Sequence, residues 1–180
     1  MINTKLEAKD LIEDYKKKAL KFPRATNSAI NKVAVQTKTF ISKEIRSEYN
    51  IKAALLNKNF HIEKSTWKTL RAKIEGTGAG IGLKQFGAKR TSRAIKQKSG
   101  KKRFQVQVKI KKGKPIERIS GNVFMGKKIV WERTETHPFE KVYGPGVAAM
   151  FNRKMQNKAS IFIQNKFPAI LENEIKFFNE

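Results

Sequence analysis

The chain has 180 residues, 39% of them hydrophobic, which is enough for a domain with a buried core and argues against disorder throughout. It has no cysteine, which excludes disulfides, cysteine zinc ligands and thiol nucleophiles. A formal net charge of +25 favours polyanionic or acidic partners. No apolar run is long enough to cross a membrane, and early acidic residues argue against a signal peptide.

Two helices are predicted in the first 50 residues. Apolar residues at helical spacing predict the first helix over 4–21, and Pro23 interrupts it. A second helix is predicted over 24–49 from a mostly apolar face at helical spacing, made of Ile30, Val33, Ala34, Thr37, Phe40, Ile41, Glu44 and Ile45. We treat 1–50 as an N-terminal helical segment that forms one structural unit with an α+β domain over 51–180.

A change of period follows a short predicted helix over 51–58. Alternating residues predict strands at 60–62 and 70–74, joined by a turn near Ser65. The glycine-rich segment over 76–82 is predicted to be a flexible loop.

The clearest strand signal is FQVQVKI, residues 104–110, whose polar face carries Gln105, Gln107 and Lys109. Such alternation is typical of an antiparallel sheet with one solvated face. A turn is predicted over 111–115. A hairpin around Gly126 is predicted from strands at 119–125 and 128–133.

The last part of the chain is predicted to be an irregular segment over 134–146 and then a helix. The helix begins near Val147, its apolar face continues through Ile161 to Ile163, and Pro168 should kink or end it. The expected fold class is α+β, with N-terminal helices, a largely antiparallel sheet of four to five strands and a C-terminal helix.

None of the chemical motifs that the sequence suggests is complete. GTGAGIG, residues 76–82, lacks the third glycine of the dinucleotide fingerprint, and GLKQFGAK, residues 82–89, has Ala88 where a phosphate loop needs Lys. His61 and His137 have no accompanying ligand set for a metal. We therefore expect no cofactor, no metal, no small-molecule substrate and no catalytic activity.

A basic stretch over 83–118 is the remaining candidate for binding. Contact with DNA or with an acidic partner is one interpretation and a solvated, mobile surface is the other, and the sequence leaves both open. Phe86 and Phe104 are assigned to the core, so they are not base-stacking residues, and no nucleic-acid-binding motif is present. The candidate contact residues are Lys84, Lys89, Arg90, Arg93, Lys98, Lys101, Lys102, Arg103, Lys111 and Lys112.

Segments between about Tyr49 and Met155 resemble the prophage minor tail protein Z family. They include IGLKQFGAKRTSRAIK, VQVKIKKGKPIERISGNVFM and IVWERT, and the best match is PFEKVYGPGVAAMF. Gly146 stands where the family usually has Ser, and the loop before Pro138 is shorter and less basic than the family pattern. The motif residues, which are also candidates for a subunit interface, are Pro138, Phe139, Tyr143, Gly144, Pro145 and Gly146.

The resemblance implies a structural role in completing the phage tail at its head-proximal end, where the tail joins the head and DNA passes. It implies a homo-oligomeric ring, with a hexamer favoured, and other tail and neck proteins as partners. The expected location is the virion, after assembly in the host cytoplasm. The alternative is a nonspecific nucleic-acid-binding protein. Trp67, Trp131, Phe139 and Tyr143 are expected to be core or interface anchors, with Trp131 in the core.

Overall fold

The structure is a computed structural model. It describes residues 22–91, 95–96, 102–103, 105–114, 117–119, 123–126, 130–132 and 140–179, so the helix expected over 4–21 lies outside the described residues. The described chain divides into two compact units. Unit 1 contains the described residues up to Phe40, Ile62–Glu75 and those from Gln156 onward; unit 2 contains Ile41–His61 and Gly76–Met155.

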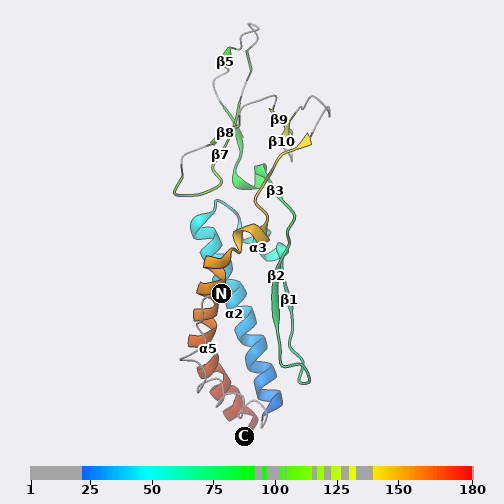
Figure 1. The fold of residues 1–180 in the computed structure, drawn as a ribbon, viewed down its shortest axis with the longest axis vertical. Coiled ribbons are helices and arrows are strands. Elements are labelled where there is room, and N and C mark those ends of the chain that lie inside the picture. Colours follow the sequence, from blue (N-terminus) through cyan, green and yellow to red (C-terminus); the bar gives the residue numbers. More distant parts are fainter. Residues whose placement is uncertain are drawn as a thin grey trace. The chain divides into compact units, whose positions relative to one another are not determined.

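The described elements alternate between helices and short strands, in the order shown in Figure 1. The helices are α2 (Pro23–Glu48), α3 (Ala53–Asn59), the 3-10 helix η1 (Leu83–Phe86), α4 (Val147–Met150) and α5 (Arg153–Asn179). The strands are β1 (Phe60–Glu63), β2 (Lys73–Gly76), β3 (Ile81–Gly82), β4 (Lys89–Arg90), β5 (Ile95–Lys96), β6 (Lys102–Arg103), β7 (Val106–Val108), β8 (Glu117–Ile119), β9 (Val123–Met125), β10 (Val130–Glu132), β11 (Glu140–Lys141) and β12 (Tyr143–Gly144). The α+β class is confirmed.

Helix α2 matches the prediction from sequence closely. It begins at Pro23, a residue that suits the first helical position because its ring fixes a helical φ and its missing N–H has no helical partner there. The predicted face is buried at Val33, Ile41 and Ile45. The apolar periodicity therefore identified both the helix and the side that packs.

Helix α5 differs from the prediction in two ways. A separate short helix, α4, precedes it, because the Asn152 side chain accepts a hydrogen bond from the Met155 N–H (3.1 Å) and starts a new helix. Ile161 and Ile163 are exposed rather than buried. The helix does not end at Pro168, which was one of the two outcomes expected there, and Leu171 beyond it is fully buried. Proline has no N–H, so one hydrogen bond of the helix is lost there, but the C-terminal turns beyond it still pack against the protein.

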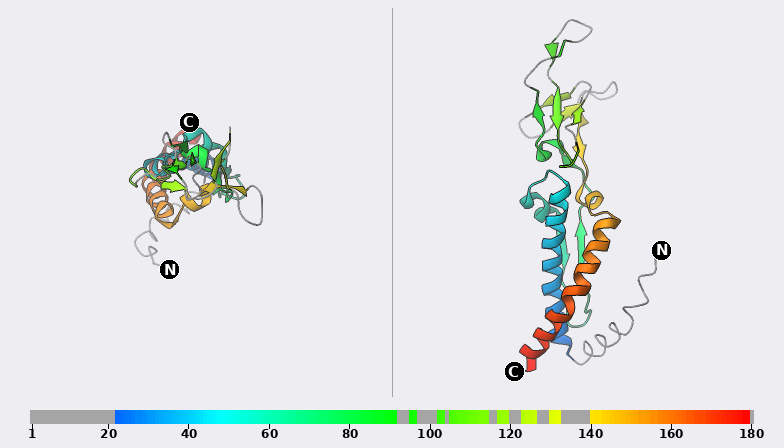
Figure 2. Two further views of the ribbon diagram at one scale, coloured as in Figure 1. Left: turned by 90° about the horizontal axis from the view of Figure 1, so that it is seen from above. Right: turned by 90° about the vertical axis from the view of Figure 1, so that its left-hand side faces the viewer.

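Within unit 1, α2 and α5 run antiparallel and side by side (Figures 1 and 2). The rings of Phe40 and Phe162 stack with centroids 4.6 Å apart and planes 11° from parallel. The β1–β2 hairpin is held to α2 by Asn31, whose side chain donates to the Ser65 carbonyl (3.1 Å) and accepts from the Ser65 N–H (2.8 Å). This pair of hydrogen bonds fixes the loop that carries Trp67.

Unit 2 is built from small sheets rather than from the single sheet expected. Among the described residues, the strands form five sheets of two or three strands each. In the sheet β4-β7-β8, Val106 and Val108 are buried while Gln107 between them is not, which confirms the one-sided strand. The predicted hairpin around Gly126 is also confirmed, as β9 pairs antiparallel with β10.

Three local expectations for unit 2 are wrong. Ile119 belongs to β8, which pairs with β7, and not to the hairpin. The segment expected to be irregular contains β11 and β12, and the loop expected to be flexible contains β3. β3 and β12 form because they pair with each other, and each is only two residues long. A strand of two residues is too short to show a periodic pattern in the sequence.

Candidate functional site

The Tyr143–Gly146 part of the family-like motif lies where β12 crosses β3. Tyr143 is opposite Gly82 and Gly144 is opposite Ile81. Gly144 lies against the fully buried ring of Phe86: a Cβ added to Gly144 would be 2.6 Å from Cε2 of that ring. Only glycine therefore lets the strand lie this close to the aromatic core.

Gly146 makes a second close contact with backbone. A Cβ there would be 2.5 Å from the carbonyl oxygen of Ala79 and 2.8 Å from that of Gly78. Its φ is −76°, so the requirement for glycine comes from space and not from backbone conformation. We call Gly144 and Gly146, with Phe86 and Ala79, the glycine clamp. The clamp gives a physical reason why glycine occupies positions 144 and 146 of this chain.

Tyr143 is the most exposed of the motif residues that the structure describes. Its side chain is 53% exposed, whereas Pro145 is half-buried and Gly146 is buried. Pro138 and Phe139 lie outside the described residues. The motif thus combines a tightly packed turn with one outward aromatic ring. Of the other expected anchors, Trp67 is exposed and Trp131 is only half-buried. Trp131 is therefore not a core residue.

The basic candidates of unit 2 lie partly on the sheet β4-β7-β8. Lys89 and Arg90 form β4, the edge strand, opposite Gln107 and Val106, and both are exposed. Lys84 differs from them, because it is half-buried and donates to the carbonyl of Gly126 (3.3 Å). Lys84 is therefore partly engaged within the protein.

Lys111 and Lys112 lie on the exposed turn that leaves β7. The Lys112 N–H donates to the carbonyl of Glu48 (2.9 Å) at the end of α2, and the Asn50 N–H donates to that of Ile110 (2.8 Å). The ammonium of Lys111 lies 5.5 Å from the centroid of the Tyr49 ring. Cations at the C-terminus of a helix also interact favourably with its dipole, so the turn has a structural role as well as a free charged surface.

The other basic candidates are not brought into this group by the described structure. Lys102 and Arg103 form β6, which pairs with β5. Arg93, Lys98 and Lys101 lie outside the described residues, as does Phe104. The structure therefore places four exposed candidates, at β4 and at the turn after β7, on one small sheet and its connection.

No metal-binding cluster is found among the described residues. They contain no group of three His, Cys, Asp or Glu side chains able to hold a metal ion. His61 is exposed on β1, and Glu132 and Glu140 lie opposite each other on β10 and β11. Within the same described part of the chain, no helix is long and apolar enough to cross a membrane.

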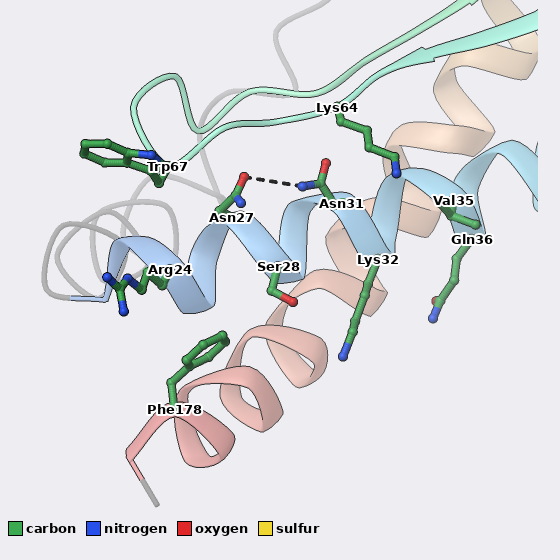
Figure 3. A pocket seen from close by; sticks show the side chains of 10 residues that line it. All are labelled: Arg24, Asn27, Ser28, Asn31, Lys32, Val35, Gln36, Lys64, Trp67 and Phe178. Atoms are coloured by element: carbon green, nitrogen blue, oxygen red, sulfur yellow. Dashed lines mark hydrogen bonds between the residues drawn. The ribbon is translucent and has the colours of Figure 1, made fainter.

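A pocket of about 710 Å³ lies along α2 in unit 1, and it was not predicted from the sequence (Figure 3). Its floor is a stripe of α2 that includes Arg24, Ser28, Asn31 and Val35, spaced four, three and four residues apart. Such spacing places the four residues on one helical face. We call this pocket the α2 groove.

Two walls border the α2 groove. The β1–β2 loop supplies Lys64 and Trp67, and the end of α5 supplies Phe178. Trp67 is 62% exposed and Phe178 is 47% exposed. Of these wall residues, only Trp67 was expected from the sequence to be an anchor. The adjacent Phe177 and Phe178, in an otherwise polar last turn of α5, were the available signal for the second wall.

An ion pair fixes the position of α5 beside the groove. Lys32 donates to Glu174, whose side chain is only 8% exposed. Burial raises the pKa of Glu174, but hydrogen bonds from Lys32 and Ser28 and the charge of Lys32 outweigh it and hold the pKa below its ordinary value. Glu174 is therefore charged at neutral pH and holds the two helices together.

Comparison with known proteins gives one result for the whole chain. The family model for the prophage minor tail protein Z (GPZ) matches residues 7–178. No curated protein and no solved structure matches the chain.

Proposed function

The chain belongs to the prophage minor tail protein Z family, and from this premise we propose that it completes the head-proximal end of a phage tail as a ring-forming subunit. Membership of this family identifies the chain as a phage tail protein, and as a virion component that associates with other tail proteins. The proposal adds the position in the tail, the role in joining tail to head, and a ring for which we favour six subunits.

The observation that carries the proposal is the family match over residues 7–178, and the glycine clamp supports it. A ring needs one patch on each subunit to meet a different patch on the next, repeated until the ring closes. The clamp holds exposed Tyr143 on a turn that cannot relax, because Gly144 and Gly146 both lie against fixed neighbours. A preorganised aromatic side chain is a common anchor of protein interfaces.

Light scattering of the full chain, at low and at physiological salt and with and without tail components, tests the ring. We expect a discrete oligomer that survives physiological salt, with closed rings visible by electron microscopy. Tyr143→Ala should weaken the oligomer, whereas His61→Ala, also at an exposed ring, should not. Monomers under every assembly condition would contradict the proposal.

A second candidate is nonspecific nucleic-acid binding, favoured by the exposed Lys89, Arg90, Lys111 and Lys112. Binding through phosphates should weaken with salt, and Lys89→Ala with Arg90→Ala should reduce the slope of log affinity against log salt by about 2. The matched control is Lys52→Ala with Lys58→Ala, which removes two exposed cations elsewhere in unit 2. DNA binding that vanishes well below physiological salt would exclude this function.

A further inference from the structure

We propose that the α2 groove is a docking site for an acidic, amphipathic helix of another protein, whose apolar side chains bind between Trp67 and Phe178 and whose carboxylates bind beside Lys64. The groove presents exposed aromatic rings, the charged side chains among its described lining residues are all basic, and one of its walls is a braced loop. The groove lies within unit 1, and its binding does not depend on the ring or on the position of the chain in a tail.

The aromatic rings of the groove lie on the two sides of the first turns of α2 (Figure 3). Trp67 and Phe178 are both exposed, and so is Val35 further along the floor. Exposed apolar side chains that gather in one hollow are typical of sites that bind the apolar face of a helix. The groove therefore supplies surface for anchors one or two turns apart on a partner helix.

The charge of the groove selects an acidic partner. Arg24 and Lys64 are exposed, whereas Lys32, on the other side of α2 from Lys64, is paired with the buried carboxylate of Glu174 (Figure 3). Arg24 and Lys64 are therefore the cations most accessible to carboxylates of a partner. Complementary charge speeds encounter and fixes the register of the bound chain. A second copy of this chain, with a net charge of +25, is a poor source of such carboxylates.

The construction of the groove favours a helix over an extended strand. Its lining comes from α2, from the β1–β2 loop and from the end of α5, so it offers side chains rather than the open edge of a sheet. A helix satisfies its own backbone hydrogen bonds and can bind such a surface through side chains alone. The floor from Arg24 to Val35 rises about 16 Å, which matches about three turns of a partner helix.

The same lining favours a polypeptide over a nucleic acid. Nucleic-acid affinity grows with the number of phosphates that cations neutralise, and here Lys32 already has a carboxylate partner. Val35 is about one turn along α2 from Lys32, so exposed apolar surface adjoins the cations. A phosphate backbone leaves that surface unmatched, whereas an amphipathic helix can cover it.

The loop that carries Trp67 is held in place before any partner binds. The Thr66 N–H donates to the Thr69 hydroxyl and the Thr69 N–H donates to the Thr66 hydroxyl, both at 3.2 Å. The Leu70 N–H also donates to the Thr66 carbonyl (2.9 Å). A side chain presented on a fixed loop costs less ordering when a partner binds. Trp67 is therefore a preorganised anchor for the partner helix.

Fluorescence anisotropy of a labelled synthetic helix, titrated with the full-length chain at physiological salt, tests the proposal. The probe carries two leucines one turn apart, glutamates one turn further along the same face, and alanine and glutamine elsewhere. We expect saturable binding, and Trp67→Ala should weaken it by about tenfold. Arg24→Glu with Lys64→Glu should also weaken it by about tenfold. The same charge-reversed variant should bind a probe with lysines in place of the glutamates better than the wild-type chain does.

The matched control is Lys52→Glu with Lys58→Glu, which makes the same charge change at exposed sites of unit 2. It should change the affinity for the acidic probe by less than about twofold, because salt screens exposed charges that lie far from a bound ligand. Lys32 is left unchanged, since it is paired with Glu174. Unchanged thermal unfolding by circular dichroism would show that each variant is folded.

Absence of binding by the acidic probe would overturn the proposal. So would equal loss of affinity in the charge-reversed and control variants, or no loss with Trp67→Ala, since the probe would then be held by general charge attraction. Oligothymidine that binds more tightly than the probe and is equally sensitive to Trp67→Ala would assign the groove to nucleic acid and would also overturn it. A monomeric mass by light scattering contradicts the proposed ring and leaves these affinities unaffected, so the two failures are distinguishable.

Discussion

Replacing Gly146 with alanine should destabilise unit 2 by steric overlap alone. The backbone of Gly146, with φ −76° and ψ 168°, is acceptable for any residue, so no conformational strain is added. The new methyl group would lie 2.5 Å from the carbonyl oxygen of Ala79, and backbone must move to relieve the contact. Overpacking of this kind costs about 2 kcal/mol.

Thermal unfolding followed by circular dichroism measures this cost. For a chain of this length, about 2 kcal/mol corresponds to a fall in Tm of about 4–8 °C. The matched control is Gly78→Ala in the neighbouring loop, where a Cβ meets nothing within 4 Å, and it should leave Tm nearly unchanged. Equal Tm values for the two variants would refute the steric account of the clamp.

Two further predictions concern unit 1. Glu174→Gln should cost about 1–2 kcal/mol at pH 7; because folding lowers the pKa of Glu174 below the ordinary 4.5, this difference in urea unfolding should be full above pH 4.5 and should shrink as pH falls below it. A difference that is constant with pH would show that its charge contributes nothing. Asn31→Ala should cost about 1–3 kcal/mol and speed exchange of the Ser65 amide, whereas Gln36→Ala, at an exposed site on the same helix, should do neither.

The sequence predicted those elements whose signal is long or strongly periodic. The apolar repeat of α2 continues over several turns, and the alternation around β7 marks one buried face, so both were found. The exposure of Ile161, and whether α5 would end at Pro168, were not, because they depend on what α5 packs against. Residue type alone does not tell which side of a partly apolar helix has a neighbour.

The candidate sites show the same division. The motif around Gly144 was located from its residues, but the reason for its glycines lies in Phe86 and Ala79, which are more than 55 positions earlier in the sequence. The α2 groove combines α2 with Trp67 and Phe178, and no local pattern links such distant segments. Contacts of this kind become visible only when the chain is folded.

The Lys32–Glu174 pair also determines when unit 1 can form. The two residues are 142 positions apart, and unit 1 is assembled from three separate stretches of the chain. Long-range contacts of this kind slow folding, because the intervening chain must be ordered or closed into a loop before they form. During synthesis, unit 1 therefore stays incomplete until Glu174 has left the ribosome, whereas every residue of unit 2 has by then been made.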